Sequence, residues 1–207
     1  MLELSCIVLV GGKSTRMGSD KRELEIGGKS FFEGAVEKAR KISRDIIISL
    51  GDAGQVKGDF KDATLVIDEE KGRGPLFALA SSLKRCKRSY AAVLPVDAPL
   101  LNPAIYRRMA EEIEKDPTIE AVVPRSDDGP QPLYGIYRVS AFLSACNKTI
   151  ARGGESVLEA ISALKKVRFI DVEEFRVIDP KLLSFHNVNT PSDLKVLEEK
   201  LYGNERL

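Results

Sequence analysis

The chain has 207 residues and a formal net charge of +1, which is enough length for one domain with a full hydrophobic core. Because positive and negative charges nearly balance, the composition indicates no general affinity for nucleic acid or for a membrane surface. The sequence has no segment typical of a signal peptide and no run of about 18 apolar residues. We therefore expect a soluble, cytoplasmic protein that forms one domain over residues 1–207, without nucleic-acid or membrane partners.

Apolar runs alternate with amphipathic segments through the first two thirds of the chain, a pattern typical of an α/β fold. Strands are predicted at residues 4–10, 24–26, 45–50, 64–68, 90–95 and 119–123. Helices are predicted from Ser30, from about residue 76 to 85 and after Pro103, and Ser30 and Glu33 have the spacing of a capping box. Right-handed crossovers would make the strands parallel and gather the loops at their carboxyl ends. The predicted fold class is therefore a Rossmann-like three-layer α/β sandwich with a mostly parallel sheet.

The last third of the chain has a less regular pattern. Strands could form at residues 133–138 and 167–172, and helices at residues 140–148 and 156–164. A last helix is predicted to begin at Thr190, because Pro191 suits the first turn and Asp193 brings negative charge to the positive end of the helix.

The cysteines and the single histidine offer little chemistry. Cys6, Cys86 and Cys146 are far apart and have apolar neighbours, so we expect buried free thiols rather than zinc ligands or disulfides. His186 is the only histidine, which leaves one candidate for a histidine base and none for a multi-histidine metal site.

The most informative stretch is residues 9–21, LVGGKSTRMGSDK, which follows the first predicted strand. Gly11 and Gly12 allow the backbone to turn sharply after a buried strand and to approach a ligand closely. Arg16 and Lys21 add positive charge, so backbone amides and cations could converge on the phosphates of a nucleoside triphosphate. An ordinary strand-to-helix turn with solvated lysines is the alternative.

Two common phosphate-binding signatures do not fit this stretch. A Walker A loop needs a glycine five positions before its Gly-Lys pair, but Ile7 and Glu23 occupy those places. The dinucleotide fingerprint needs a glycine two positions after its first, where the chain has Lys13. We therefore expect neither a P-loop nor a nicotinamide cofactor.

The glycine-rich stretch resembles the opening signature of the molybdenum cofactor guanylyltransferases, within a wider family of nucleotidyltransferases that share its Gly-Gly, Arg-Met-Gly and Lys elements. The resemblance is close at residues 9–21 and around Asp97, and it is faint over residues 135–180. It implies a fold of the nucleotidyltransferase type, with a nucleotide half at about residues 1–100 and an acceptor half at about residues 101–207. Val10 replaces the usual family alanine.

The resemblance also implies which residues bind the nucleotide. The implied nucleotide-binding residues are Leu9, Val10, Gly11, Gly12, Lys21, Ser49, Asp68, Gly74 and Asp97. The implied catalytic residues are Arg16, Lys21 and Asp97. Ser49 stands where the family often has an asparagine near the base, which leaves the base preference open. Asp68 matches an aspartate that contacts the guanine nucleotide, with Glu69 as an alternative in register.

Asp97 directly follows an apolar strand and lies in a turn with a proline two residues to either side. A single carboxylate there suits Mg²⁺, which takes one or two protein carboxylates together with waters and triphosphate oxygens. The resemblance places the family's metal aspartate in this motif and a second ligand late in the chain, for which Asn189 is the candidate and Asn187 the alternative. Structural roles, as a turn aspartate and as loop asparagines before a helix, remain open. The expected cofactor is Mg²⁺.

The second substrate leaves weaker signals. Residues from the region that lines the pterin side in this family are Arg125, Lys148, residues 131–134 and residues 152–154. Arginine there would suit a terminal phosphate.

The activity implied by the resemblance is the transfer of GMP from GTP to the terminal phosphate of (molybdenum-)molybdopterin, which yields the guanine dinucleotide cofactor and pyrophosphate. A phosphate oxygen is already ionised at neutral pH, so alignment and charge neutralisation suffice without a protein nucleophile. A CTP-dependent molybdopterin cytidylyltransferase, another small-phosphate nucleotidyltransferase, and a non-catalytic GTP-binding or cofactor-carrier module remain alternatives. The expected partners are GTP and molybdopterin, with transient contacts to proteins that deliver or accept the cofactor, and the chain would be a monomer or a small homo-oligomer.

Overall fold

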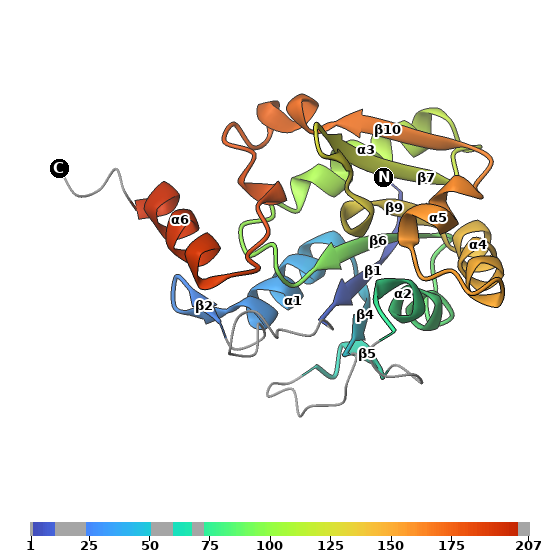
Figure 1. The fold of residues 1–207 in the computed structure, drawn as a ribbon, viewed down its shortest axis with the longest axis horizontal. Helices are drawn as coiled ribbons and strands as arrows, with labels where there is room; N and C mark the ends of the chain where they lie inside the picture. The colour runs from blue at the N-terminus through green and yellow to red at the C-terminus, as the bar shows by residue number, and fades with distance from the viewer. Residues whose placement is uncertain (1, 11–23, 51–59, 68–72, 203–207) are drawn as a thin grey trace.

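A computed structural model describes residues 2–10, 24–50, 60–67 and 73–202 of the chain. Its centre is an eight-stranded sheet with the strand order β10-β7-β9-β6-β1-β4-β5, with β8 paired to β7 (Figure 1). The strands are β1 (Leu4–Leu9), β4 (Asp45–Ser49), β5 (Ala63–Val66), β6 (Tyr90–Pro95), β7 (Ala121–Ser126), β8 (Gly129–Pro130), β9 (Ile136–Arg138) and β10 (Val167–Asp171). A separate hairpin pairs β2 (Glu25–Ile26) with β3 (Lys29–Ser30).

Helices cover both faces of this sheet and form two hydrophobic cores. One core contains side chains of α1 (Phe31–Ile42) and α3 (Ala104–Lys115), and the other contains those of α2 (Pro75–Leu83), α4 (Val139–Ala151) and α5 (Val157–Ser162). Along β1, Cys6 and Val8 face the first core and Ile7 and Leu9 face the second. The 3-10 helix η2 (Pro132–Tyr134) lies between β8 and β9, and the 3-10 helices η3 (Val172–Val177) and η4 (Leu183–Phe185) and helix α6 (Pro191–Tyr202) follow β10. The predicted three-layer α/β fold is confirmed.

Local sequence accounts for the regular elements. Strand β1 is buried along its whole length, as expected for a strand covered on both faces, and it is therefore apolar throughout apart from Ser5. At the start of α1, the Ser30 Oγ accepts the Glu33 amide at 3.2 Å, and the Glu33 carboxylate accepts the Ser30 amide at 3.1 Å. The predicted capping box is confirmed, and the other helices and strands differ from their predicted ranges mainly at their ends.

Strand β9 departs from the parallel arrangement that the sequence suggested. It lies between β6 and β7 and is antiparallel to both, so β6 and β7 are not neighbours although they run in the same direction. The strand considered over residues 133–138 covers only Ile136–Arg138, because the chain first makes the 3-10 turn Pro132–Tyr134. The link from the end of β7 to β9 is short, and a parallel neighbour needs a crossover of about a dozen residues or more.

The carboxyl ends of four parallel strands form one edge of the sheet. Leu9 is in register with Ser49 and with Pro95, and Ser49 is in register with Val66. In Figure 1 the arrowheads of β1 and β6 point to the side from which α6 projects. None of the described helices is long and apolar enough to cross a membrane.

The three thiols lie mostly inside the protein. Cys6 and Cys146 are buried, Cys86 is half-buried, and all three are free. Burial raises the pKa of the Cys86 thiol to about 12 and that of the Cys146 thiol to about 12. The prediction of buried free thiols is confirmed for Cys6 and Cys146, and Cys86 keeps part of its surface exposed.

Candidate functional site

The carboxyl edge of the sheet begins where β1 ends. The Val10 amide donates to the Ser49 carbonyl at 2.9 Å, and the Val96 amide donates to the Leu9 carbonyl at 3.1 Å. These backbone hydrogen bonds continue the pairing of the strands one residue beyond their ends. Strands β1, β4 and β6 therefore end side by side. The Ser49 side chain is buried rather than presented at the surface.

Several of the predicted nucleotide-binding and catalytic residues lie outside the described residues. These are Gly11, Gly12, Arg16, Lys21 and Asp68, together with the alternative Glu69. Their proposed contacts stay predictions, and the geometry of the site rests on the residues that follow.

Gly74 is the residue that precedes helix α2 at this edge. Its φ of 85° and ψ of −179° place it in a region that L-residues with a side chain rarely adopt, although a Cβ there would meet no atom within 4 Å. A glycine is therefore needed at this position because of the backbone angles, and not because a side chain would lack space. Pro75 follows in the first turn of α2, where its missing N–H group costs no hydrogen bond.

The Arg73 side chain contacts both the start of α2 and the connection between α4 and α5. Its guanidinium lies 4.0 Å from the centre of the Phe77 ring and 3.8 Å from the Glu155 carboxylate. The α4–α5 connection therefore lies beside the start of α2, at the same edge of the sheet.

Asp97 lies two residues past β6 and is half-buried. Its carbonyl accepts the Val188 amide at 2.8 Å, which fixes residues 187–189 beside the Asp97 turn although the two segments are far apart in sequence. Val188 is buried, whereas Asn187 and Asn189 on either side of it are exposed. The structure thus brings the Asp97 turn beside the segment that carries the two asparagines that the sequence singled out.

A side-chain cap holds the backbone of Asn189. The Asp193 carboxylate accepts the Asn189 amide and the Thr190 amide, both at 2.8 Å, and the Asp193 amide donates to the Thr190 Oγ1 at 3.2 Å. The predicted helix start at Thr190 is confirmed. Since Asn189 immediately precedes this cap, its position relative to α6 is fixed.

Tyr134 also belongs to this group, and sequence reasoning placed it only in a broad acceptor region. Its side chain is buried, and its hydroxyl donates to Oδ1 of Asn187. Burial, and next the negative charge of Asp97, raise the pKa of Tyr134 above its usual value. A buried tyrosine hydroxyl needs a partner, but no local pattern indicates that the partner lies 53 residues later in the chain.

The chain is similar to proteins of a known family. Residues 6–167 match the family described as the MobA-like NTP transferase domain. The chain belongs to this family. It is 33% identical over 204 residues to the protein named "Probable molybdenum cofactor guanylyltransferase" of Methanothermobacter thermautotrophicus, covering 95% of this chain and 100% of that protein. The resemblance seen in the sequence is confirmed.

Solved structures agree with this assignment. The molybdopterin-guanine dinucleotide biosynthesis protein A from Archaeoglobus fulgidus superposes with a TM-score of 0.80 at 28% identity, over 97% of this chain and 100% of that chain. The 2-C-methyl-D-erythritol 4-phosphate cytidylyltransferase from Thermus thermophilus gives a TM-score of 0.70 at 16% identity, over 97% and 99% of the two chains. The second likeness shows a shared fold only.

The polar groups beside the Asp97 turn suit a hard cation. Within the described part of the chain, no three His, Cys, Asp or Glu side chains cluster as a metal site. Asp97 and Asn189 carry oxygen donors, and one carboxylate with neutral oxygens is a donor set that fits Mg²⁺ and not zinc. The residues present therefore fit the metal that the sequence suggested.

The residues expected on the acceptor side do not lie together in one place. Arg125 stacks its guanidinium 4.1 Å from the centre of the Phe169 ring on the neighbouring strand β10. Gly153, with a φ of 81°, ends helix α4, where its amide donates to the Ile150 carbonyl at 2.9 Å. The glycines at residues 153–154 thus have a structural explanation as a helix end.

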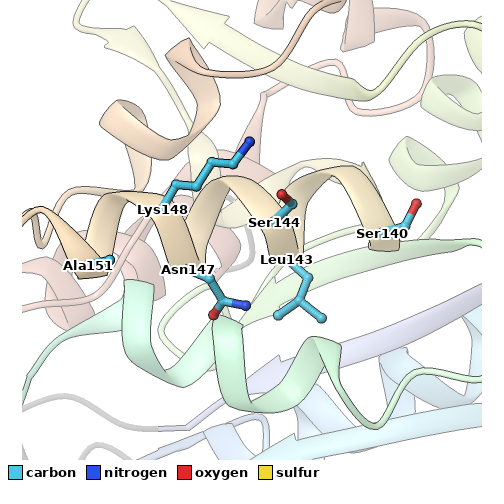
Figure 2. A pocket seen from close by; sticks show the side chains of 6 residues that line it. All are labelled: Ser140, Leu143, Ser144, Asn147, Lys148 and Ala151. Atoms are coloured by element: carbon cyan, nitrogen blue, oxygen red, sulfur yellow. The ribbon is translucent and has the colours of Figure 1, made fainter.

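Lys148 lines a shallow hollow of about 550 Å³ along α4 (Figure 2). Leu143 and Asn147 point to one side of the helix and Lys148 to the other. The lining residues are Ser140, Leu143, Ser144, Asn147, Lys148 and Ala151. All belong to α4, so this hollow is separate from the group around Asp97.

Proposed function

We propose that the protein is a molybdenum cofactor guanylyltransferase that transfers GMP from GTP to the terminal phosphate of molybdopterin. The observation that supports this most directly is the bond between the Val188 amide and the Asp97 carbonyl, at 2.8 Å. This backbone bond holds the turn that carries the Asp97 carboxylate beside the segment that carries two exposed asparagine side chains. The chain belongs to the MobA-like NTP transferase family. A relative that matches nearly the whole chain carries the guanylyltransferase name.

The chemistry asks the protein to align two anions. An oxygen of the acceptor phosphate forms a bond to the α-phosphorus of GTP while the bond from this phosphorus to the bridging oxygen breaks, and the electron pair leaves with pyrophosphate. The attacking oxygen is ionised at neutral pH, so the protein has no proton to remove. The residues proposed for alignment on the nucleotide side are Leu9, Val10, Ser49 and Gly74, whose strand ends and helix start share one edge.

Charge neutralisation is the second task. We assign Asp97 and Asn189 as the residues that hold Mg²⁺, and bound Mg²⁺ would supply positive charge to the triphosphate oxygens. Arg16 and Lys21 remain the proposed cations of the glycine-rich stretch, and Asp68 the proposed contact to the base, all in segments outside the described residues. Strands from both proposed halves share one sheet, which supports a single domain over residues 1–207.

Two measurements test this function. Calorimetric titration with GTP, CTP and ATP in the presence of magnesium should show preferential binding of GTP, and addition of molybdopterin should release pyrophosphate from GTP. Preferential binding and use of CTP would show that the protein is a cytidylyltransferase and not a guanylyltransferase. A cytidylyltransferase with the same fold is the reason to include CTP in the titration. GTP binding without pyrophosphate release would indicate a binding or carrier module.

A further inference from the structure

Tyr134 links two segments of the proposed site from inside the protein. It ends the 3-10 turn Pro132–Tyr134, immediately before the antiparallel strand β9, and only 2% of its surface is exposed. Its ring lies 5.5 Å from the Phe185 ring, which in turn lies 5.4 Å from the Phe175 ring. The aromatic packing holds the ring, so the direction of the hydroxyl group is set by the core.

The hydroxyl group is a hydrogen-bond donor to Oδ1 of Asn187. A phenol is protonated at neutral pH, so the Tyr134 hydroxyl group keeps its donor, and burial with the nearby Asp97 raises its pKa further. Asn187 itself is exposed, and the next residue, Val188, donates its amide to the Asp97 carbonyl. Two hydrogen bonds therefore hold Asn187 in place. Tyr134 binds its side chain, and the Asp97 carbonyl binds the backbone amide of the next residue, Val188.

This arrangement decides which part of the Asn187 amide is available to a ligand. An asparagine side chain offers an acceptor oxygen and an NH₂ group with two donors. The oxygen is bound to Tyr134, and among the described residues the Nδ2 group has no hydrogen-bond partner. The exposed Asn187 side chain thus offers two N–H donors that no described residue uses, and such donors suit an anionic oxygen.

We propose that Tyr134 is a positioning residue that, through Oδ1 of Asn187, directs the Asn187 Nδ2 group at a phosphate oxygen of a bound substrate beside Asp97. The inference rests on the proposed function and gives the two asparagines different roles. Asn189 supplies the neutral oxygen for the metal, and Asn187, the alternative metal ligand in the sequence, serves as an anion donor. The phosphate belongs either to the nucleotide or to the acceptor.

Kinetics of pyrophosphate release test the inference in the full-length protein. Tyr134→Phe keeps the ring packing and removes the donor, and we expect kcat/KM to fall about tenfold, the loss of one hydrogen bond that positions a reacting group. Asn187→Ala should lose at least as much, and the double variant should be no worse than Asn187→Ala, because Tyr134 acts through Asn187. A rise in KM for GTP or for molybdopterin identifies which phosphate is bound.

Two further variants make the test specific. Asn187→Asp still accepts the Tyr134 hydroxyl but has no NH₂ group, so its activity should fall to the level of Asn187→Ala. Tyr106→Phe is the matched control, since the buried Tyr106 hydroxyl donates to the backbone carbonyl of Val93 in the core. This control should keep the wild-type kcat and both wild-type KM values.

Distinct results separate this inference from the proposed function. If the wild-type protein releases no pyrophosphate, the proposed function fails. If the wild type is active, then wild-type kinetics in Tyr134→Phe or in Asn187→Asp would overturn the positioning role. Additive losses in the double variant would also overturn it, because two residues that act as one unit cannot add.

Discussion

The parallel strands β5, β4, β1 and β6 and the later segment of residues 127–190 are built in different ways. In the first region, strand follows strand in register, and the central strands are buried along their whole length. In the second region the elements other than α4 are short, and individual polar contacts tie several of the connections between them. The Ser184 Oγ accepts the Asn102 amide at 2.9 Å, and the Asp179 carboxylate accepts the Ser184 amide at 2.7 Å.

The comparison teaches where the candidate site comes from. The parallel region supplies a rigid edge that ends in Asp97, and the later region supplies Tyr134, Asn187 and Asn189. Neither region contains the whole group. The site therefore depends on the contact between the two regions. Substitutions in each region should show which residues are needed for activity and which are needed for stability.

Asp97→Asn should have the largest effect. The substitution keeps the size of the side chain and removes the carboxylate, so we expect turnover to fall by roughly 10⁴-fold, more than about 5 kcal/mol in the barrier, with the fold intact. Pyrophosphate release and circular dichroism measure the two effects. Asp127→Asn, an exposed residue in the turn between β7 and β8, is the control and should keep wild-type activity. Wild-type turnover in Asp97→Asn would remove the metal assignment.

Phe175→Ala should produce the largest loss of stability. Phe175 has no exposed surface and packs against Phe185 in the later region, and its removal should lower the free energy of unfolding by about 3–5 kcal/mol. Urea denaturation monitored by circular dichroism measures the loss. Val177→Ala in the same 3-10 helix is the control, because Val177 is 86% exposed and should change stability little. Equal losses in both variants would mean that the later region is not packed as described.

Gly74→Ala tests the parallel region at the start of α2. Its backbone angles are unfavourable for alanine, so we expect a loss of about 1–3 kcal/mol in the free energy of unfolding and weaker GTP binding by calorimetry. Gly34→Ala in the interior of α1 is a control with the opposite sign, because alanine favours a helix and should stabilise the protein by about 0.5–1 kcal/mol. A stabilised Gly74→Ala variant would contradict the strained backbone at this position.

Asp116→Asn should give the smallest effect and one that depends on pH. The Lys166 ammonium, 2.5 Å away, and then Thr118 lower the pKa of the Asp116 carboxyl to about 2 from an ordinary value of 3.8. The stabilisation is therefore complete above pH 4 and is lost as the pH falls through 2. It is small because both partners are exposed to solvent.

Urea midpoints at pH 7 and at pH 2 measure this effect. The Asp116→Asn variant should be slightly less stable than the wild type at pH 7, and most of the difference should be lost at pH 2. Parallel curves for the two proteins across this range would show that the ion pair between the α3–β7 turn and the start of β10 contributes nothing.

Much of the parallel region could be predicted from the sequence, because its signals are local. A buried strand reads as an apolar run, and a helix start reads as a cap such as Ser30 with Glu33 or Thr190 with Asp193. Asp97 could be named for the same reason, since it lies just past a recognisable strand, whereas the asparagines at 187 and 189 are named from the family resemblance. The antiparallel direction of β9 could not be predicted, because its three residues give no periodicity to read.

By itself the sequence determined the layers of the fold, the family and the residues that offer oxygen and amide groups. Only the tertiary structure decided that β9 separates β6 from β7, that Val188 bonds to Asp97, and that Tyr134 holds Asn187 by its oxygen. The physical reason is the range of the forces involved. Propensity, capping and burial act over a few neighbouring residues, whereas a hydrogen bond between distant segments depends on the packing of everything that lies between them.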